Sequence, residues 1–207
     1  MQPAPASPRK HGDSPCPTGA RAFLGVGSNI RPEEMVPAAL ELLSEAVSLS
    51  GISTFYRTVP LGDTTAPTFY NGVLEIHTTL SINALEEVLA RTEAALGRVR
   101  GKHRDSPRPI DLDLLLFLPG TRDEGTAIRE GEDAGEEGQK PGLEARPPHR
   151  DLLTRAFVAL PLLELHPDLL LPPDQMPLRA LARRFSDPCG EPLLEFTQGL
   201  RRRFLGL

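Results

Sequence analysis

The sequence predicts a mixed α/β (α+β) domain with ferredoxin-like βαββαβ order, in which both helices cover one face of an antiparallel sheet and a helical extension follows. Three observations support this prediction. Four short runs are apolar or alternate in polarity, as strands do, and two longer segments repeat apolar residues every three to four positions. These six segments follow one another in the order β-α-β-β-α-β.

The first three elements are a strand, a helix and a second strand. Residues 21–27 (RAFLGVG) form a short apolar run that ends in glycine, which is typical of a buried strand. Pro32 suits the first turn of a helix, and the two glutamates after it suit the positive end of the helix dipole. The apolar face of this helix spans 35–46. Residues 52–58 are the second predicted strand, which Pro60 ends.

The next three elements are again a strand, a helix and a strand. Residues 69–78 alternate and predict a third strand, and Ser81 is a good N-cap for a second helix that Gly97 ends. Residues 110–117 (IDLDLLLF) predict the fourth strand. Beyond it, the sequence predicts a helix and a short helical or coil segment, at 154–165 and 178–185.

Two segments have the composition of disordered chain. Residues 1–20 are rich in proline, and residues 119–142 hold seven acidic against three basic side chains with several glycines. The second segment contributes −4 to a net charge of −5, so the remaining chain is almost neutral. We therefore expect a disordered tail at 1–20 and one domain at 21–207 with a disordered acidic insertion at about 119–142.

Cysteine usage and hydropathy indicate the compartment. The two cysteines, Cys16 and Cys189, define no disulfide framework, so a reducing cytoplasm is expected. The N-terminus lacks the apolar core of a secretory signal, and no apolar stretch reaches the roughly 18–20 residues that span a bilayer. We expect a monomer that binds neither membranes nor nucleic acid.

Asp111 and Asp113 are the first candidates for chemistry. Residues at i and i+2 of a strand point to the same face, so both carboxylates project together, while Leu112, Leu114 and Leu116 point toward the helices. Two adjacent carboxylates are stable beside a cation, and oxygen ligands with room for water favour Mg²⁺ delivered with nucleotide phosphates. The alternative is a pair of solvent-facing acids on a half-exposed strand.

Arg108 is the second candidate, because the prolines on either side of it stiffen the approach to the Asp111 strand. An arginine held in this way can clamp a phosphate beside a metal. Arg98 and Arg100 add positive charge upstream. The alternative is a solvated basic loop.

Phe69 and Asn71 share a strand face by the same spacing rule. An aromatic plane beside an amide suits a flat, hydrogen-bonding heterocycle, although core and turn packing explains such a pair equally well. Residues 27–29 (GSN) could bring backbone close to a ligand, or simply make a tight turn.

Other nucleotide-binding motifs are excluded. No third glycine follows Gly25 and Gly27, as a dinucleotide fold requires, and there is no Walker A motif. Residues 149–151 spell the kinase triplet His-Arg-Asp, but the companion kinase motifs are missing.

Six blocks together resemble the 6-hydroxymethyl-7,8-dihydropterin pyrophosphokinase family: GVGSN, FYRTVPLG, FYNGVLEI, GRVR, SPRPIDLDLLLF and PPHRDLLTRAFVALPLLEL. The resemblance covers about residues 21–185 apart from the insertion. It implies a ferredoxin-like fold, two Mg²⁺ ions and the transfer of pyrophosphate from ATP to the pterin in folate biosynthesis, with release of AMP.

The resemblance also implies roles for individual residues. The implied metal ligands are Asp111 and Asp113. The implied pterin contacts are Thr58, Leu61, Phe69, Asn71 and Phe157. The implied catalytic and nucleotide-side residues are Arg98 and Arg108, together with Glu93, Arg100, His149 and Arg155.

The sequence departs from the family pattern at three places. Asp105 stands where family members carry a tryptophan that closes over the site, and Arg150 stands where an aromatic residue is frequent. The acidic segment 119–142 replaces a much shorter connection.

Two other classes of protein remain as alternatives. A ferredoxin-like RNA-binding module would use stacked aromatic residues, which this chain, at 5% aromatic content, hardly offers. A metal-dependent glycosyltransferase would need a larger domain.

Overall fold

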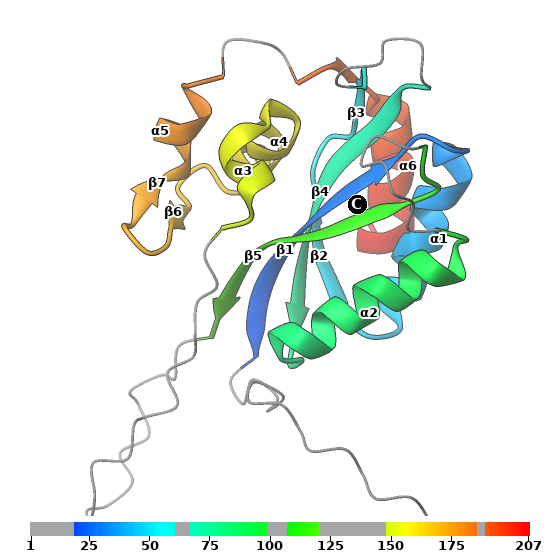
Figure 1. Ribbon diagram of the computed structural model, residues 1–207, viewed down its shortest axis with the longest axis horizontal. Coiled ribbons are helices and arrows are strands. Elements are labelled where there is room, and N and C mark those ends of the chain that lie inside the picture. Colours follow the sequence, from blue (N-terminus) through cyan, green and yellow to red (C-terminus); the bar gives the residue numbers. More distant parts are fainter. Residues whose placement is uncertain (1–18, 61–66, 99–106, 121–147, 186–188) are drawn as a thin grey trace, which may run out of the picture.

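The computed structural model describes residues 19–60, 67–98, 107–120, 148–185 and 189–207. The predicted tail and acidic insertion lie almost entirely outside these residues, so both stay predictions. The described chain has three layers, with a sheet between two groups of helices (Figure 1). One face carries α1 (Pro32–Ser44), α2 (Ile82–Ala95) and α6 (Leu194–Leu205), and the other carries α3 (Arg150–Thr154), α4 (Ala156–Leu165) and α5 (Leu178–Ala182).

The sheet is antiparallel throughout the pairings described. Its strands are β1 (Ala20–Ser28), β2 (Ser48–Ile52), β3 (Tyr56–Thr58), β4 (Phe69–Thr78), β5 (Asp111–Pro119) and β8 (Glu191–Pro192). They lie in the order β5-β1-β4-β3-β8, and β2 also pairs with β4. A separate hairpin joins β6 (Leu170–Leu171) and β7 (Met176–Pro177). The predicted mixed α/β class is confirmed, and the finer ferredoxin-like classification stays a prediction.

The second predicted strand is divided, so the continuous strand expected at 52–58 is wrong. The N–H of Thr54 donates to the Glu164 carboxylate at 3.0 Å, and the N–H of Phe55 donates to Thr197 Oγ1 at 2.9 Å. These side-chain acceptors replace the strand partner and separate β2 from β3. The Phe55 ring packs over Gly72, where a Cβ atom would come within 2.7 Å of it.

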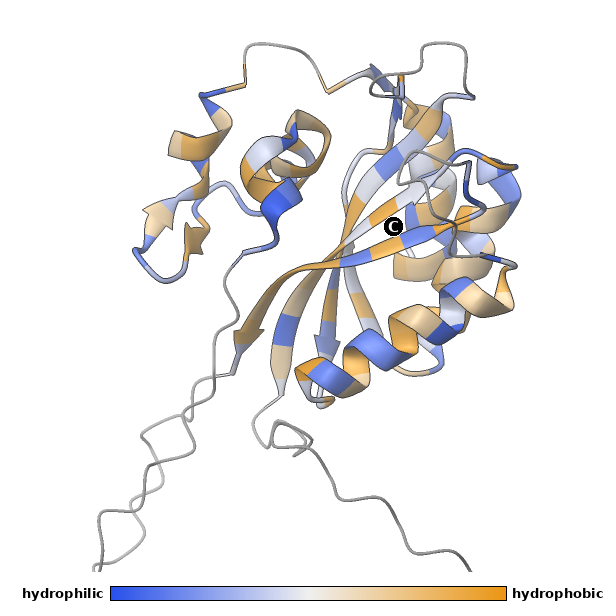
Figure 2. Cartoon of the chain, in the orientation of Figure 1, coloured by the Kyte–Doolittle hydropathy of each residue, from blue (hydrophilic) through white to orange (hydrophobic). Residues whose placement is uncertain are grey.

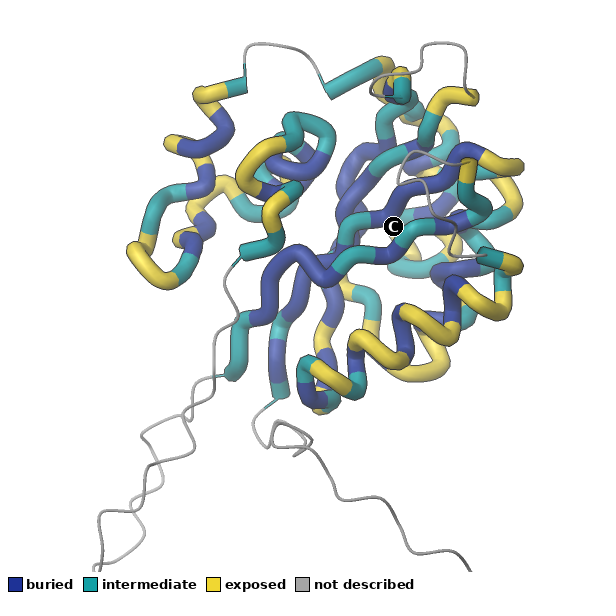
Figure 3. The backbone as a smooth tube through the Cα atoms, in the orientation of Figure 1, coloured by how far each residue is buried: buried dark blue, intermediate teal, exposed yellow. Residues whose placement is uncertain are grey.

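The helices of the first face follow their sequence signals. Pro32 begins α1, and Ser81 Oγ accepts from the N–H of Ala84 at the start of α2. Along α2, apolar and hydrophilic residues alternate (Figure 2), and the side toward the sheet is buried (Figure 3). No helix in the described ranges has the length and apolarity needed to cross a membrane.

One helix of the second face begins later than predicted. Arg155 is extended, with φ −122°, so the helix expected at 154–165 begins at Ala156 as α4, and a separate short helix, α3, precedes it. The segment predicted at 178–185 contains α5, which ends at Ala182. Both α4 and α5 pack on a core of strand residues that includes Phe23, Val73 and Leu116.

A bulge in β5 corrects one prediction about the leucines. Phe23 of β1 lies opposite Leu116, whereas the next residue, Leu24, lies opposite Leu114, so Leu115 is an extra residue. Leu114 therefore packs toward α1 and α2, as predicted, but Leu116 packs in the core under α4. The bulge comes after Asp113, so the alternation that places the two carboxylates on one face is preserved.

Candidate active site

A cavity of about 180 Å³ opens between the sheet and the α3–α4 pair. Side chains from β1, β3, β4, β5, α3 and α4 line it. Eight predicted site residues meet there: Thr58, Phe69, Asn71, Arg108, Asp111, Asp113, Arg155 and Phe157. Glu93 and Arg98 contact this set from behind Asp111, whereas the predicted Leu61 and Arg100 lie outside the described residues.

The two aspartates enter the cavity from β5, beside two glycines of β1. Asp111 lies opposite Gly27, and Asp113 lies opposite Gly25. A Cβ atom on Gly27 would come within 2.8 Å of Asn71 Oδ1, so glycine keeps this wall of the cavity open. Because Asp111 and Asp113 are two residues apart in a regular part of the strand, both carboxylates enter the cavity, as predicted.

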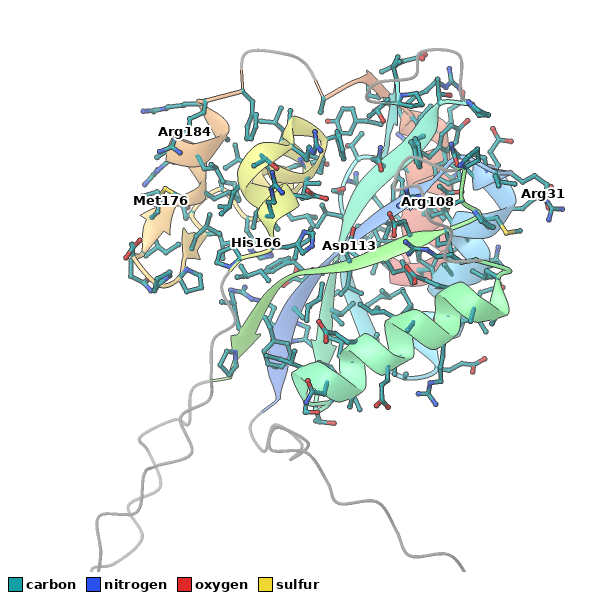
Figure 4. All side chains as sticks on the ribbon, viewed as in Figure 1. Arg31, Arg108, Asp113, His166, Met176 and Arg184 are labelled. Atoms are coloured by element: carbon teal, nitrogen blue, oxygen red, sulfur yellow. The ribbon has the colours of Figure 1, made fainter. Side chains whose placement is uncertain are left out.

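Asp113 lies in surroundings that disfavour its charge. Burial and the neighbouring Asp111 carboxylate raise the pKa of Asp113 to about 6, while His149 partly opposes the shift. Asp151 and Glu93 raise this pKa further. Figure 4 labels Asp113 on β5 and Arg108 in the segment that leads into this strand.

Asp111, by contrast, is held by two arginines. Arg98 Nη1 pairs with one carboxylate oxygen of Asp111, and Arg108 Nη1 pairs with the other. Both guanidinium groups therefore converge on one end of the acid pair, where they balance the carboxylates of Asp111 and Glu93. Such an arrangement suits a polyanion that approaches together with a cation.

Glu93 supports Arg98 from the buried side. Only 3% of Glu93 is exposed, and its carboxylate accepts from the N–H of Leu112 at 2.8 Å and pairs with Arg98. Burial raises the pKa of Glu93, while the Leu112 N–H and Arg98 oppose the shift. Glu93 thus fixes the arginine to the β5 backbone.

The opposite end of the cavity is neutral and partly aromatic. Thr58 of β3 lies opposite Phe69 of β4, and Asn71 Nδ2 donates to Thr58 Oγ1 at 2.7 Å. Phe157 reaches the same cavity from the start of α4. A flat molecule between the two rings would find amide, hydroxyl and backbone groups at its edge.

Asn29 is a structural residue that sequence reasoning mentioned only as part of a turn. It is 5% exposed, its Oδ1 accepts from the N–H of Arg108 at 2.7 Å, and its Nδ2 donates to the Pro67 carbonyl at 3.3 Å. Beside it, Ser28 Oγ donates to the Pro109 carbonyl. These bonds hold the backbone that presents Arg108 and the residues that precede β4.

Asp151 is a cavity residue that sequence reasoning missed as a site residue. His149 caps α3, where its Nδ1 accepts from the N–H of Asp151 at 3.3 Å. The Asp151 side chain lines the cavity and lies 3.9 Å from Arg155 Nε. Asp151 lies in the block PPHRD, which carries the family resemblance, and that block is the signal that could have identified it.

Comparisons with known proteins identify relatives of this chain. The model of the family described as 7,8-dihydro-6-hydroxymethylpterin-pyrophosphokinase (HPPK) matches residues 23–167. A 2-amino-4-hydroxy-6-hydroxymethyldihydropteridine pyrophosphokinase of Methylorubrum extorquens is 38% identical over 154 residues, covering 73% of this chain and 85% of that protein. The protein of the same name from Haemophilus influenzae is 35% identical over 169 residues, covering 80% and 93%.

A solved structure supports the fold. The crystal structure of a triple mutant of Plasmodium falciparum HPPK-DHPS with SDX-DHP matches with a TM-score of 0.53 at 17% identity. The match covers 80% of this chain but 44% of that longer chain.

Proposed function

The chain belongs to the 7,8-dihydro-6-hydroxymethylpterin-pyrophosphokinase family, and on that premise we propose how its cavity carries out the reaction. The protein transfers pyrophosphate to the hydroxymethyl group of the dihydropterin, a step of folate biosynthesis. The proposal assigns the charged end of the cavity to ATP and the aromatic end to the pterin.

The charged end fits Mg²⁺ bound together with ATP. Asp111 and Asp113 supply oxygen ligands from one strand face. Among the described residues, no three His, Cys, Asp or Glu side chains are grouped as a metal site, so phosphate oxygens and water would complete the coordination. Two Mg²⁺ ions held there would neutralise charge on the triphosphate.

The arginines bind the phosphates in this proposal. Arg98 and Arg108 already converge on Asp111, and contact with the β- and γ-phosphates would stabilise charge that develops during transfer. Glu93 holds Arg98 in position. Arg100, His149 and Arg155 complete the nucleotide side.

The aromatic end binds the pterin between Phe69 and Phe157. Asn71 and Thr58 hydrogen-bond its edge, and the backbone near Leu61 adds contacts. This places the pterin hydroxymethyl oxygen toward the aspartates, where it attacks the β-phosphorus in line and AMP leaves with the original bridging oxygen. The protein contributes positioning and charge neutralisation rather than covalent chemistry.

The observation that carries the proposal is the meeting of Asp111 and Asp113, two arginines and two aromatic rings around one cavity. Three further expectations rest on the sequence alone and remain part of the proposal: a monomer, a cytoplasmic location, and no binding to nucleic acid or membranes.

The test measures AMP released from ATP in the presence of 6-hydroxymethyl-7,8-dihydropterin and Mg²⁺. Changing Asp111→Asn or Asp113→Asn should lower kcat by about a hundredfold or more, because charge neutralisation at the phosphates is lost. Circular dichroism should show both variants folded.

Asp168→Asn is the matched control, since Asp168 is exposed and pairs only with Arg179 in the contacts described. Near-parental rates for both Asp111→Asn and Asp113→Asn at saturating Mg²⁺ would contradict the metal assignment. A parent protein that releases no AMP would contradict the assignment of the reaction.

A further inference from the structure

The C-terminal residues 190–205, called the strap below, comprise β8 and α6 and lie beyond residue 167, where the match to the family model ends. β8 pairs with β3, with Arg57 opposite Glu191. α6 returns across the face that carries α1 and buries Leu200 in the core (Figure 1). The strap therefore extends one edge of the sheet through β8, and it covers one face of the sheet through α6.

Both backbone groups of Phe55 are bound by the strap. The N–H of Phe55 donates to Thr197 Oγ1 at 2.9 Å, and its carbonyl accepts from the N–H of Leu193 at 2.8 Å. Thr197 is 1% exposed, and its hydroxyl donates in turn to the Leu193 carbonyl at 2.8 Å. Phe55 is the last residue of the break between β2 and β3, so these bonds decide where β3 begins.

Side chains reinforce the same attachment. Phe196 packs edge-on against Phe55 and Tyr70, with ring centroids 5.6 and 5.3 Å away. Gly190 passes so close to β3 that a Cβ atom there would come within 2.3 Å of the Arg57 carbonyl oxygen. The strap thus fits β3 along its whole length of three residues.

β3 carries the pterin end of the cavity. Thr58 is its last residue, its hydroxyl accepts from Asn71 at 2.7 Å, and Val59 and Pro60 after it line the cavity. The position of Thr58 relative to Asn71 depends on Phe55, three residues earlier, which directly precedes β3. We propose that the strap is a positioning element for the pterin half of the active site, acting through Thr197, Phe55 and β3.

The inference rests on the proposed function and extends it to a segment outside the matched family region. It also predicts selectivity between the two substrates. The strap touches β3 at one edge of the sheet, whereas Asp111 and Asp113 lie on β5 at the other edge, with β4 and β1 between them. Loosening the strap should therefore weaken pterin binding more than ATP binding.

The test compares Thr197→Val with Thr197→Ser. Valine has a similar size but leaves the Phe55 N–H without an acceptor, so the competent position of β3 is populated less and the apparent affinity falls in proportion. We expect the KM for the dihydropterin to rise about tenfold and the KM for ATP to stay within about twofold. Thr197→Ser restores the acceptor and should behave like the parent.

Gln198→Ala, at an exposed neighbour on the same helix, should change neither constant. Equal rises in both KM values for Thr197→Val, or no rise in the KM for the pterin, would overturn the proposal. If circular dichroism shows that Thr197→Val does not fold, Phe196→Leu takes its place, because it loosens contact with Phe55 and keeps the site apolar.

Hydrogen exchange in the absence of substrate separates this inference from the proposed function. The amides of Phe55, Arg57 and Thr58 should exchange faster in Thr197→Val than in the parent and Thr197→Ser. Unchanged exchange would overturn the strap proposal even if the enzyme is active. If the parent releases no AMP, the function proposal fails, while the exchange experiment still decides whether the strap holds β3.

Discussion

Asp113 illustrates how a single carboxylate can be buried in surroundings that oppose its charge, at a cost to the free protein. Its carboxylate is largely buried beside Asp111, and Asp151 and Glu93 add negative charge, so the pKa of Asp113 rises to about 6. A bound cation would relieve this repulsion. Without a cation, the repulsion destabilises the folded protein.

Asp113→Asn should therefore stabilise the free protein at neutral pH, although it should lower kcat. Because the folded pKa, about 6, lies above the ordinary value of 3.8, the folded state binds more protons between these pH values. The parent's stability should fall as pH rises through this window, and Asp113→Asn should lack that fall and gain about 1–3 kcal/mol at pH 7.

Urea unfolding of both proteins without Mg²⁺, from pH 4 to pH 8, measures this difference. The two stabilities should approach each other toward pH 4. A parent protein that is more stable than Asp113→Asn at pH 7 would show that the charged Asp113 carboxylate does not destabilise the fold.

At this scale the sequence predicted residues whose partners are close along the chain. Alternation on a strand was enough to place Asp111 beside Asp113, and Phe69 beside Asn71. Asn29 Oδ1 accepts a hydrogen bond from the N–H of Arg108, 79 residues away, and no local sequence pattern predicts that contact. Arg98 was expected near phosphate, but its attachment to buried Glu93 depends on how α2 packs on β5.

At the scale of elements, the divided second strand shows why boundaries were harder to predict. Residues 52–58 have the composition of one strand, but Thr54 and Phe55 bond instead to Glu164 and Thr197, which lie more than a hundred residues later. α6 was not predicted as a helix, since it begins without a side-chain cap and has a glycine in its interior.

Gly72→Ala tests the packing at this strand break. The added methyl group would come within 2.7 Å of the Phe55 ring, which is itself fully buried and cannot move away easily. We expect a loss of about 1–3 kcal/mol in unfolding free energy, measured in urea.

Gly199→Ala is the control, because nothing lies within 4 Å of a Cβ atom at this helical position. That change should leave stability equal or raise it by about 0.5–1 kcal/mol. Equal effects of the two alanines would contradict the close approach of Phe55 to β4.

At the scale of the whole molecule, two cores share one sheet. The core under α1, α2 and α6 and the core under α4 and α5 lie on opposite faces, and β5 contributes leucines to both. The sequence predicted the first layer from helical periodicity. It could not assign the second, since α4 is apolar nearly all round and so favours no face.

Shared strands predict one cooperative unfolding transition. Leu40→Ala in the first core and Leu162→Ala in the second should each lower the same transition by about 2–5 kcal/mol, because both side chains are fully buried. Calorimetry should show a single heat-absorption peak for the parent and both variants. Two separate peaks in either variant would show that the layers unfold independently.

The extra residue at Leu115 has a consequence for anyone who compares this chain with its relatives. Upstream of the bulge, odd-numbered positions of β5 face the cavity, whereas downstream an even-numbered one, Leu116, packs on that same side. A gapless alignment to a homologue without the bulge would then match inward residues with outward ones over half of the strand. Placing the one-residue gap after Asp113 keeps the two aspartates and the leucines of each layer in equivalent columns.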